Sequence, residues 1–213
     1  MASPILHVCV GLALLNLFKG FPGGAGGPPA NGEIRPPSIR VRRGGHRAAP
    51  LPPLAPSLAA AILACLPDLD YLPGLLRGNW NLYHQGPTHS LLFLLLATAA
   101  ALLLLQLLPA GWRSRASLPS PTPRVAALVF ALIASHLAID WMTQDFRPPI
   151  GCPWLWPLSD HPFHAPFAFI PAWKKLRVID LFSTANLYPI AVETLLGAAT
   201  LALTFLFPRP RKT

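Results

Sequence analysis

THSLLFLLLATAAALLLLQLL, residues 88–108, contains no Asp, Glu, Lys or Arg over its whole length. With a rise of about 1.5 Å per residue, a helix of this length crosses the roughly 30 Å hydrocarbon core of a bilayer. The composition agrees, because 53% of the 213 residues are hydrophobic and only 12% are charged. A typical soluble domain has about 25% charged residues. The stretch therefore indicates a membrane protein.

Two further apolar stretches are long enough to span a membrane, and two are shorter. The long ones are residues 123–142 and 186–207. Residues 4–19 and 54–66 reach across only if the bilayer thins, and otherwise they tilt or form a re-entrant pair. We therefore predict an all-α fold, a polytopic membrane bundle of about four to five spans.

The segment between the first two apolar stretches, residues 20–53, is rich in Pro, Gly and Arg. This composition does not support a packed core, so we predict a flexible basic linker. The chain then consists of a first membrane helix at residues 1–19, this linker, and a helical bundle at residues 54–213. The net charge of +9 collects in short segments between apolar stretches, so we expect no nucleic-acid partner.

The Lys and Arg residues divide unequally between the two sides of a five-span bundle. With the N-terminus outside, residues 19–53, 109–124 and 208–213 face the cytoplasm and carry twelve of the 17, leaving five outside. Cytoplasmic loops are enriched in Lys and Arg. We therefore predict a multi-pass protein of the cytoplasmic membrane, with its N-terminus outside and its C-terminus in the cytoplasm. No Lys or Arg precedes the first apolar stretch, which favours an uncleaved anchor over a signal peptide.

Two histidines stand at the start of the long apolar stretch of residues 88–108, in the motif HQGPTHS at residues 84–90. The glycine and proline of this motif break regular structure, and Thr88 can cap the helix that follows. We expect His84 and His89 to lie on a bent connection where the helix meets water.

Two other polar motifs also lie at the ends of apolar stretches. His136 and Asp140 are four residues apart, so they share one face of a helix. In the PDLD motif a proline ends the preceding helix, and Asp68 and Asp70 can bind a cation from an irregular turn. The predicted topology places all these residues on one side of the membrane, together with His7. Ionisable groups at membrane depth are retained mainly when they pair, bind something or line a wet cavity.

A cluster of imidazoles and carboxylates at this place predicts a divalent metal ion. Mixed nitrogen and oxygen ligands suit zinc, manganese or iron, whereas calcium prefers oxygen ligands alone. Each motif by itself also has an ordinary interpretation: an interhelical hydrogen bond for HxxxD, a polar loop for PDLD, and helix capping for HQGPTH. Glu193, inside an apolar stretch, is either the partner of a metal ligand or a hydrogen-bonding group within the bundle.

In combination, the motifs resemble a known bacterial family. PDLD, HQGPTHSLL, SHLAIDWMT, WPLSD and FSTANLYPIAVETLLG are similar to segments of the LexA-regulated, membrane-bound predicted metal-dependent hydrolases. The resemblance covers residues 57–207 well and residues 1–19 weakly. Gln85 stands where the family usually has Arg, and residues 20–53 look like an insertion. The resemblance implies an inner-membrane protein whose expected metal ligands are His7, Asp68, Asp70, His84, His89, His136 and Asp140.

These observations favour a metal-dependent hydrolase at the outer face of the cytoplasmic membrane. The metal would activate a bound water, with Asp70 as candidate general base, and the expected partners are the lipid bilayer and a lipid or lipid-linked phosphoester substrate. Two alternatives stay open. One is a transporter or a proton or metal pathway that uses the same residues, and the other is a non-catalytic membrane protein with an ion-paired bundle.

Overall fold

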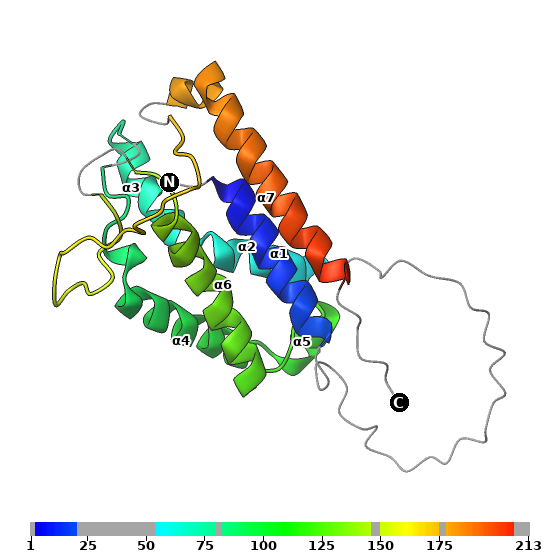
Figure 1. Cartoon of the computed structure of the whole chain (residues 1–213). Coiled ribbons are helices and arrows are strands. Elements are labelled where there is room, and N and C mark those ends of the chain that lie inside the picture. The colour runs from blue at the N-terminus through cyan, green and yellow to red at the C-terminus, as the bar shows by residue number, and fades with distance from the viewer. Residues whose placement is uncertain (1–2, 21–53, 80–81, 146–149, 175–177, 207–213) are drawn as a thin grey trace, which may run out of the picture.

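The computed structural model describes residues 3–20, 54–79, 82–145, 150–174 and 178–206, and this part of the chain is helical (Figure 1). The α-helices are α1 (Pro4–Gly20), α2 (Leu54–Ala64), α3 (Tyr71–Leu76), α4 (Leu91–Leu107), α5 (Ala110–Arg115), α6 (Pro123–Trp141) and α7 (Leu187–Leu206). Short 3₁₀ helices connect them: η1 (Leu66–Asp70), η2 (Pro87–His89), η3 (Val178–Phe182) and η4 (Thr184–Asn186). The described residues contain isolated β-bridges but no strand. The predicted all-α fold is confirmed, whereas the predicted linker lies outside the described residues except for Gly20.

Two helical segments are long and apolar enough to cross a membrane, namely α6 and Thr184–Leu206. A third candidate span is the pair of α2 and the segment Leu66–Leu76, which bends by 62° at its break. The helix Pro4–Phe18 and α4 are apolar but shorter. The structure thus supports a helical membrane protein with two or three full-length candidate spans among the described residues, fewer than the four to five that the sequence predicts.

Helix α4 begins later than the sequence pattern indicates. Pro87–His89 forms η2, and Ser90 then caps α4 by accepting a hydrogen bond from the backbone N–H of Phe93 at 3.1 Å. The expectation that Thr88 caps this helix was therefore wrong. Its hydroxyl is used elsewhere, because it donates to Asp70 at 2.7 Å.

Helix α1 packs against α2, α6 and α7, and it runs alongside α7 in Figure 1. Small residues permit this packing. A Cβ atom added to Gly11 would lie 2.9 Å from the Cβ of Ala64, and one added to Gly197 would lie 2.8 Å from the Cβ of Cys9. Small residues at such crossings let membrane helices approach closely. A buried hydrogen bond of 2.8 Å from Asn16 to Thr204 also joins α1 to α7.

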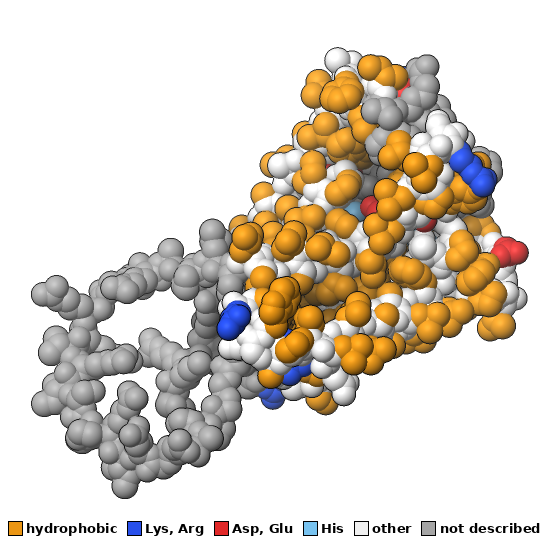
Figure 2. All heavy atoms as spheres, turned by 180° about the vertical axis from the view of Figure 1, so that it is seen from behind, with side chains coloured by type: hydrophobic (Ala, Val, Ile, Leu, Met, Phe, Trp, Pro, Cys, Tyr) orange, Lys and Arg blue, Asp and Glu red, His pale blue; other side chains and the backbone are white. Residues whose placement is uncertain are grey.

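Apolar side chains form both the interior and much of the exterior. Leu94 of α4 packs with Val129, Ile133 and Leu137 of α6 in the largest buried cluster. Hydrophobic side chains also cover much of the described surface seen in Figure 2. Leucines on the outer side of α4 are exposed, for example Leu104. Such a surface matches lipid chains better than water.

The long connection between α6 and α7 folds back onto one end of the bundle. The backbone N–H of Ala165 donates to the carbonyl of Trp141 at 3.0 Å, and that of Gln144 donates to Ile170 at 2.8 Å. The N–H of Leu91, at the start of α4, donates to the carbonyl of Trp154 at 2.9 Å. This connection therefore holds the C-terminal end of α6 next to the N-terminal end of α4.

Candidate metal centre

The structure brings all seven predicted ligands into one cluster at this end of the bundle. His7 comes from the start of α1, Asp68 and Asp70 from η1, His84 and His89 from the connection that includes η2, and His136 and Asp140 from the end of α6. All are buried except Asp68, whose side chain retains 13% of its exposure. Four separate segments of the chain thus contribute to one polar site inside an apolar bundle.

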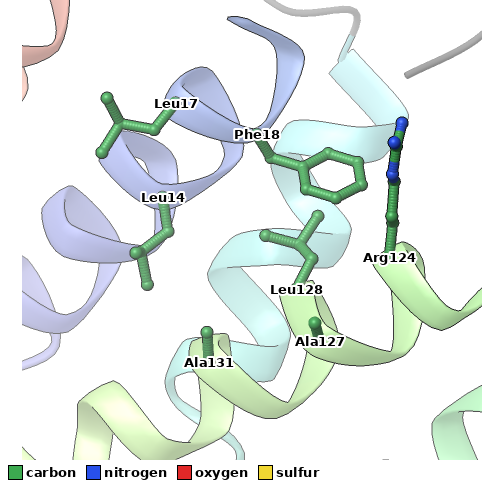
Figure 3. Close-up of a pocket in the computed structure, with 7 residues that line it drawn as sticks. All are labelled: Leu14, Leu17, Phe18, Arg124, Ala127, Leu128 and Ala131. Carbon is green, nitrogen blue, oxygen red and sulfur yellow. The ribbon is translucent and has the colours of Figure 1, made fainter. Parts of the chain in front are cut away.

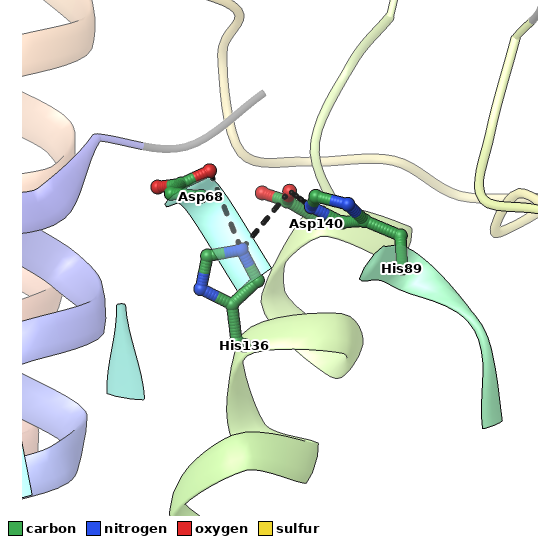
Figure 4. A group of neighbouring side chains, drawn as sticks. All are labelled: Asp68, His89, His136 and Asp140. Carbon is green, nitrogen blue, oxygen red and sulfur yellow. Dashed lines mark ion pairs between the residues drawn. The ribbon is translucent and has the colours of Figure 1, made fainter. Parts of the chain in front are cut away.

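The carboxylate of Asp140 lies at the middle of the cluster (Figure 4). Its Oδ2 atom is 3.2 Å from Nε2 of His89 and 3.6 Å from Nε2 of His136. Its Oδ1 atom is 3.5 Å from Nε2 of His7. On the other side of His136, the same Nε2 atom is 3.5 Å from Oδ1 of Asp68. Three imidazole rings therefore point their Nε2 atoms toward carboxylate oxygens.

These Nε2 atoms are buried and make no hydrogen bond within the described part of the chain. This holds for His7, His89 and His136 alike. Buried polar atoms without a hydrogen bond are uncommon in folded proteins. A cation among them would satisfy the imidazole lone pairs and the carboxylates together, so the residues fit a metal ion. Ligand atoms of Asp68, His89, His136 and Asp140 all lie within 4.8 Å of one another.

The other ring nitrogens of two histidines have partners that fix the orientation of the ring. Nδ1 of His136 lies 2.8 Å from the carbonyl oxygen of Ala64, and Nδ1 of His89 lies 3.2 Å from Oδ2 of Asp70. A carbonyl only accepts, so Nδ1 of His136 must carry its proton. Metal-binding histidines in proteins typically donate their second N–H to such a carbonyl or carboxylate.

Asp70 contacts the opposite ring nitrogen of His89 from the one that faces Asp140, and it makes several further contacts. Its Oδ2 accepts a hydrogen bond from Thr88, and its Oδ1 lies 2.9 Å from Nδ1 of His84. The ring of Tyr71 stacks on His84 at 3.9 Å between centroids. Asp70, His84 and His89 form a second group whose ligand atoms lie within 4.8 Å. The two groups share His89.

The connection before η2 depends on one glycine. Gln85 adopts a left-handed φ of 58° and is buried. A Cβ atom on Gly86 would lie 2.8 Å from the carbonyl oxygen of Tyr83. The turn therefore needs glycine at this position to place His84 and His89 on either side of Asp70.

Glu193 is fully buried and joins three parts of the chain. Its carboxylate accepts hydrogen bonds from the backbone N–H of Ser3, at 2.8 and 3.0 Å, and from the Ser3 hydroxyl. It also accepts a hydrogen bond of 2.6 Å from Nε1 of Trp173. Glu193 thus anchors the start of α1, one turn before His7, to α7. Its contacts favour the second expectation for this residue, a hydrogen-bonding group of the bundle.

Cys152, in the connection between α6 and α7, is completely buried. Burial raises the pKa of its thiol well above the usual value, and the negative charges of Asp140 and Asp145 raise it further. The thiol is therefore neutral at physiological pH, and it does not belong to either group of candidate ligands.

Sequence reasoning did not find two groups that contact the candidate ligands, the carbonyl of Ala64 and the hydroxyl of Thr88. It also did not find the Ser3 and Trp173 donors that hold Glu193. A backbone carbonyl has no sequence signature. The TH pair before an apolar stretch was the one available signal for Thr88, and it equally suits helix capping.

A family model described as YdjM inner membrane protein matches residues 1–210. The searches of curated proteins and of solved structures found no match.

Proposed function

The chain belongs to the YdjM inner membrane protein family, and on this premise we propose that it is a membrane-bound, metal-dependent hydrolase. One observation carries the proposal. Buried Nε2 atoms of His89 and His136, without hydrogen bonds among the described residues, converge on the carboxylate of Asp140. In an apolar bundle such an arrangement is costly unless a cation or a proton compensates it.

The four residues Asp68, His89, His136 and Asp140 would hold the metal ion. Two imidazoles and two carboxylates suit zinc, manganese or iron. His7, whose ring stacks on His136 at 3.8 Å between centroids, is a further candidate ligand from α1. When bound, the metal would supply an activated water and polarise a phosphoryl or carbonyl oxygen.

Asp70 has two candidate roles beside the metal. Its contacts with His84, His89 and Thr88 support a positioning role, in which it orients His89. The general-base role requires Asp70 to exchange one of these partners for the attacking water. Measurements of metal affinity and of activity separate the two roles. Loss of a positioning residue lowers both, whereas loss of a general base lowers the activity alone.

A lipid or lipid-linked phosphoester is the substrate class that the surroundings favour. Leu69 and Leu72 lie beside Asp68 and Asp70 in the chain, and both are more than half exposed. An apolar surface next to the candidate site suits a substrate that stays in the bilayer. With the N-terminus outside, as the Lys and Arg distribution favours, the site faces the outer side of the cytoplasmic membrane.

A transport pathway is the alternative that the same residues raise. Such a pathway needs polar groups that continue through the membrane. The buried His and Asp residues of the described chain that could relay a proton or a metal gather at one end. Toward the other end, α1 and α7 are joined by the neutral pair Asn16 and Thr204. This distribution favours a hydrolase.

Metal analysis of the purified protein tests the proposal. We expect wild-type protein to retain near-stoichiometric zinc, manganese or iron, and His136→Ala with Asp140→Ala to lose it. The matched control is His164→Ala with Asp160→Ala, because these residues are exposed and belong to neither ligand group. The metal-loaded wild type should also release phosphate from phosphatidic acid in mixed micelles. Wild-type protein without metal overturns the metal centre, and metal without hydrolysis of any phosphoester favours the non-catalytic alternative.

A further inference from the structure

An apolar groove lies at the opposite end of α1 and α6 from the candidate metal centre. The groove, of about 580 Å³, opens between these helices (Figure 3). Leu14, Leu17 and Phe18, in the last part of α1, form one wall. The volume falls within the range of about 300–1,000 Å³ that is typical of small-molecule sites.

The wall formed by α6 is charged at one end and apolar along the rest. Ala127, Leu128 and Ala131 are apolar, whereas Arg124, at the start of α6, is the charged residue among the described residues that line the groove. These residues are three or four positions apart, so they follow one face of the helix. Figure 3 shows the Arg124 side chain extending beside the ring of Phe18. The two alanines leave the space that larger side chains would fill.

We propose that this groove binds one anionic glycerophospholipid. An acyl chain lies along the apolar walls, and the headgroup phosphate pairs with the guanidinium of Arg124. The planar guanidinium can donate two parallel hydrogen bonds to a phosphate. Basic pockets between membrane helices are known to recognise anionic lipid headgroups. A soluble anion would leave the apolar walls without a partner, and a helix of another protein would have to accommodate the Arg124 charge.

The other arginines nearby supply a control. Arg113 donates to the carbonyl oxygen of Leu105 at 2.9 Å and to that of Gln106 at 3.3 Å, so it caps the end of α4. Arg115 of α5 is exposed and does not line the groove. Arg115→Gln therefore removes the same charge as Arg124→Gln without changing the groove.

Lipid titration followed by native mass spectrometry tests the proposal. Delipidated, detergent-purified protein is titrated with dioleoyl phosphatidylglycerol or with dioleoyl phosphatidylcholine. We expect one phosphatidylglycerol to bind more tightly than phosphatidylcholine. Arg124→Gln should weaken phosphatidylglycerol binding roughly fivefold, the factor that about 1 kcal/mol gives, whereas Arg115→Gln should not. Ala127→Leu, at an exposed position, should fill the groove and weaken both lipids.

Each of the other outcomes overturns the site. Equal affinity for the two lipids shows contact with acyl chains alone, and equal loss in both arginine variants shows a general effect of surface charge. Unchanged binding in Ala127→Leu shows that the lipid lies elsewhere. Absence of any bound lipid in the titration excludes a lipid as the occupant of the groove. Thermal unfolding and metal content are measured on every variant, so that a misfolded protein is recognised and the result stays independent of the metal centre.

Discussion

Nδ1 of His136 lies 2.8 Å from the carbonyl oxygen of Ala64, although the two residues are 72 positions apart in the chain. Because the carbonyl accepts the ring proton, the Nε2 lone pair is left to face Asp68 and Asp140. Ala64 is the last residue of α2, where helix carbonyls lose their intrahelical partners. One hydrogen bond therefore joins α2 to α6 and also orients a candidate ligand.

His136→Asn separates these two consequences. The amide nitrogen of asparagine can replace Nδ1 as donor to Ala64, but asparagine has no counterpart of Nε2. We expect the variant to lose bound metal, while the free energy of unfolding of the metal-free protein changes by less than about 1 kcal/mol. His136→Ala should lose both the metal and the hydrogen bond. Elemental analysis and denaturant titration give the two readouts, and full metal content in His136→Asn would exclude Nε2 as a ligand atom.

Asp70→Asn tests whether Asp70 positions His89. Loss of a carboxylate that orients a metal-binding histidine typically weakens metal affinity about 10- to 100-fold. We expect a loss of this size for zinc, measured by competition with a chromophoric chelator. Asp160→Asn, an exposed carboxylate of the connection before α7, should leave the affinity unchanged. Complete loss of zinc binding would instead make Asp70 a direct ligand, and an unchanged affinity would remove it from the site.

Local sequence pattern was sufficient to predict the long apolar helices and to place polar motifs at their ends. The four-residue spacing of His136 and Asp140 places both on one face of α6, where the structure has them converge with His89. Patterns within one segment could not reveal how distant segments contact each other. Ser3 and Glu193 are 190 positions apart, and no local periodicity connects them.

The capping residue of α4 is a second feature that the local sequence could not predict. Thr88 and Ser90 are both good capping residues, and either one suits the HQGPTHS motif. Ser90 is the cap in the structure, because Thr88 is held by its hydrogen bond to Asp70. The choice depends on a tertiary contact with η1, which the local sequence does not encode.

Glu193→Ala should destabilise the bundle without emptying the metal centre. The substitution leaves the backbone N–H of Ser3 and Nε1 of Trp173 without their acceptor. A buried donor without an acceptor costs about 1 to 3 kcal/mol, so we expect a loss of this order or more in the free energy of unfolding. Glu193→Gln retains one acceptor and should lose less. Loss of metal with an unchanged free energy of unfolding would instead make Glu193 a partner of the metal ligands.

Gly197→Ala tests the close contact of α1 and α7. The added Cβ would lie 2.8 Å from the Cβ of Cys9 and 2.9 Å from its sulfur, so the two helices must move apart. Overpacking of this kind typically costs about 1 to 3 kcal/mol. Gly111→Ala, in α5, is the matched control, because nothing lies within 4 Å of its added Cβ. Alanine is favoured over glycine within a helix by about 0.5 to 1 kcal/mol, so this variant should be unchanged or slightly more stable. Denaturant titration of both variants compares the two positions. If Gly197→Ala were as stable as Gly111→Ala, α1 and α7 would not pack as closely as the structure places them, and the anchoring of His7 through α1 would need another explanation.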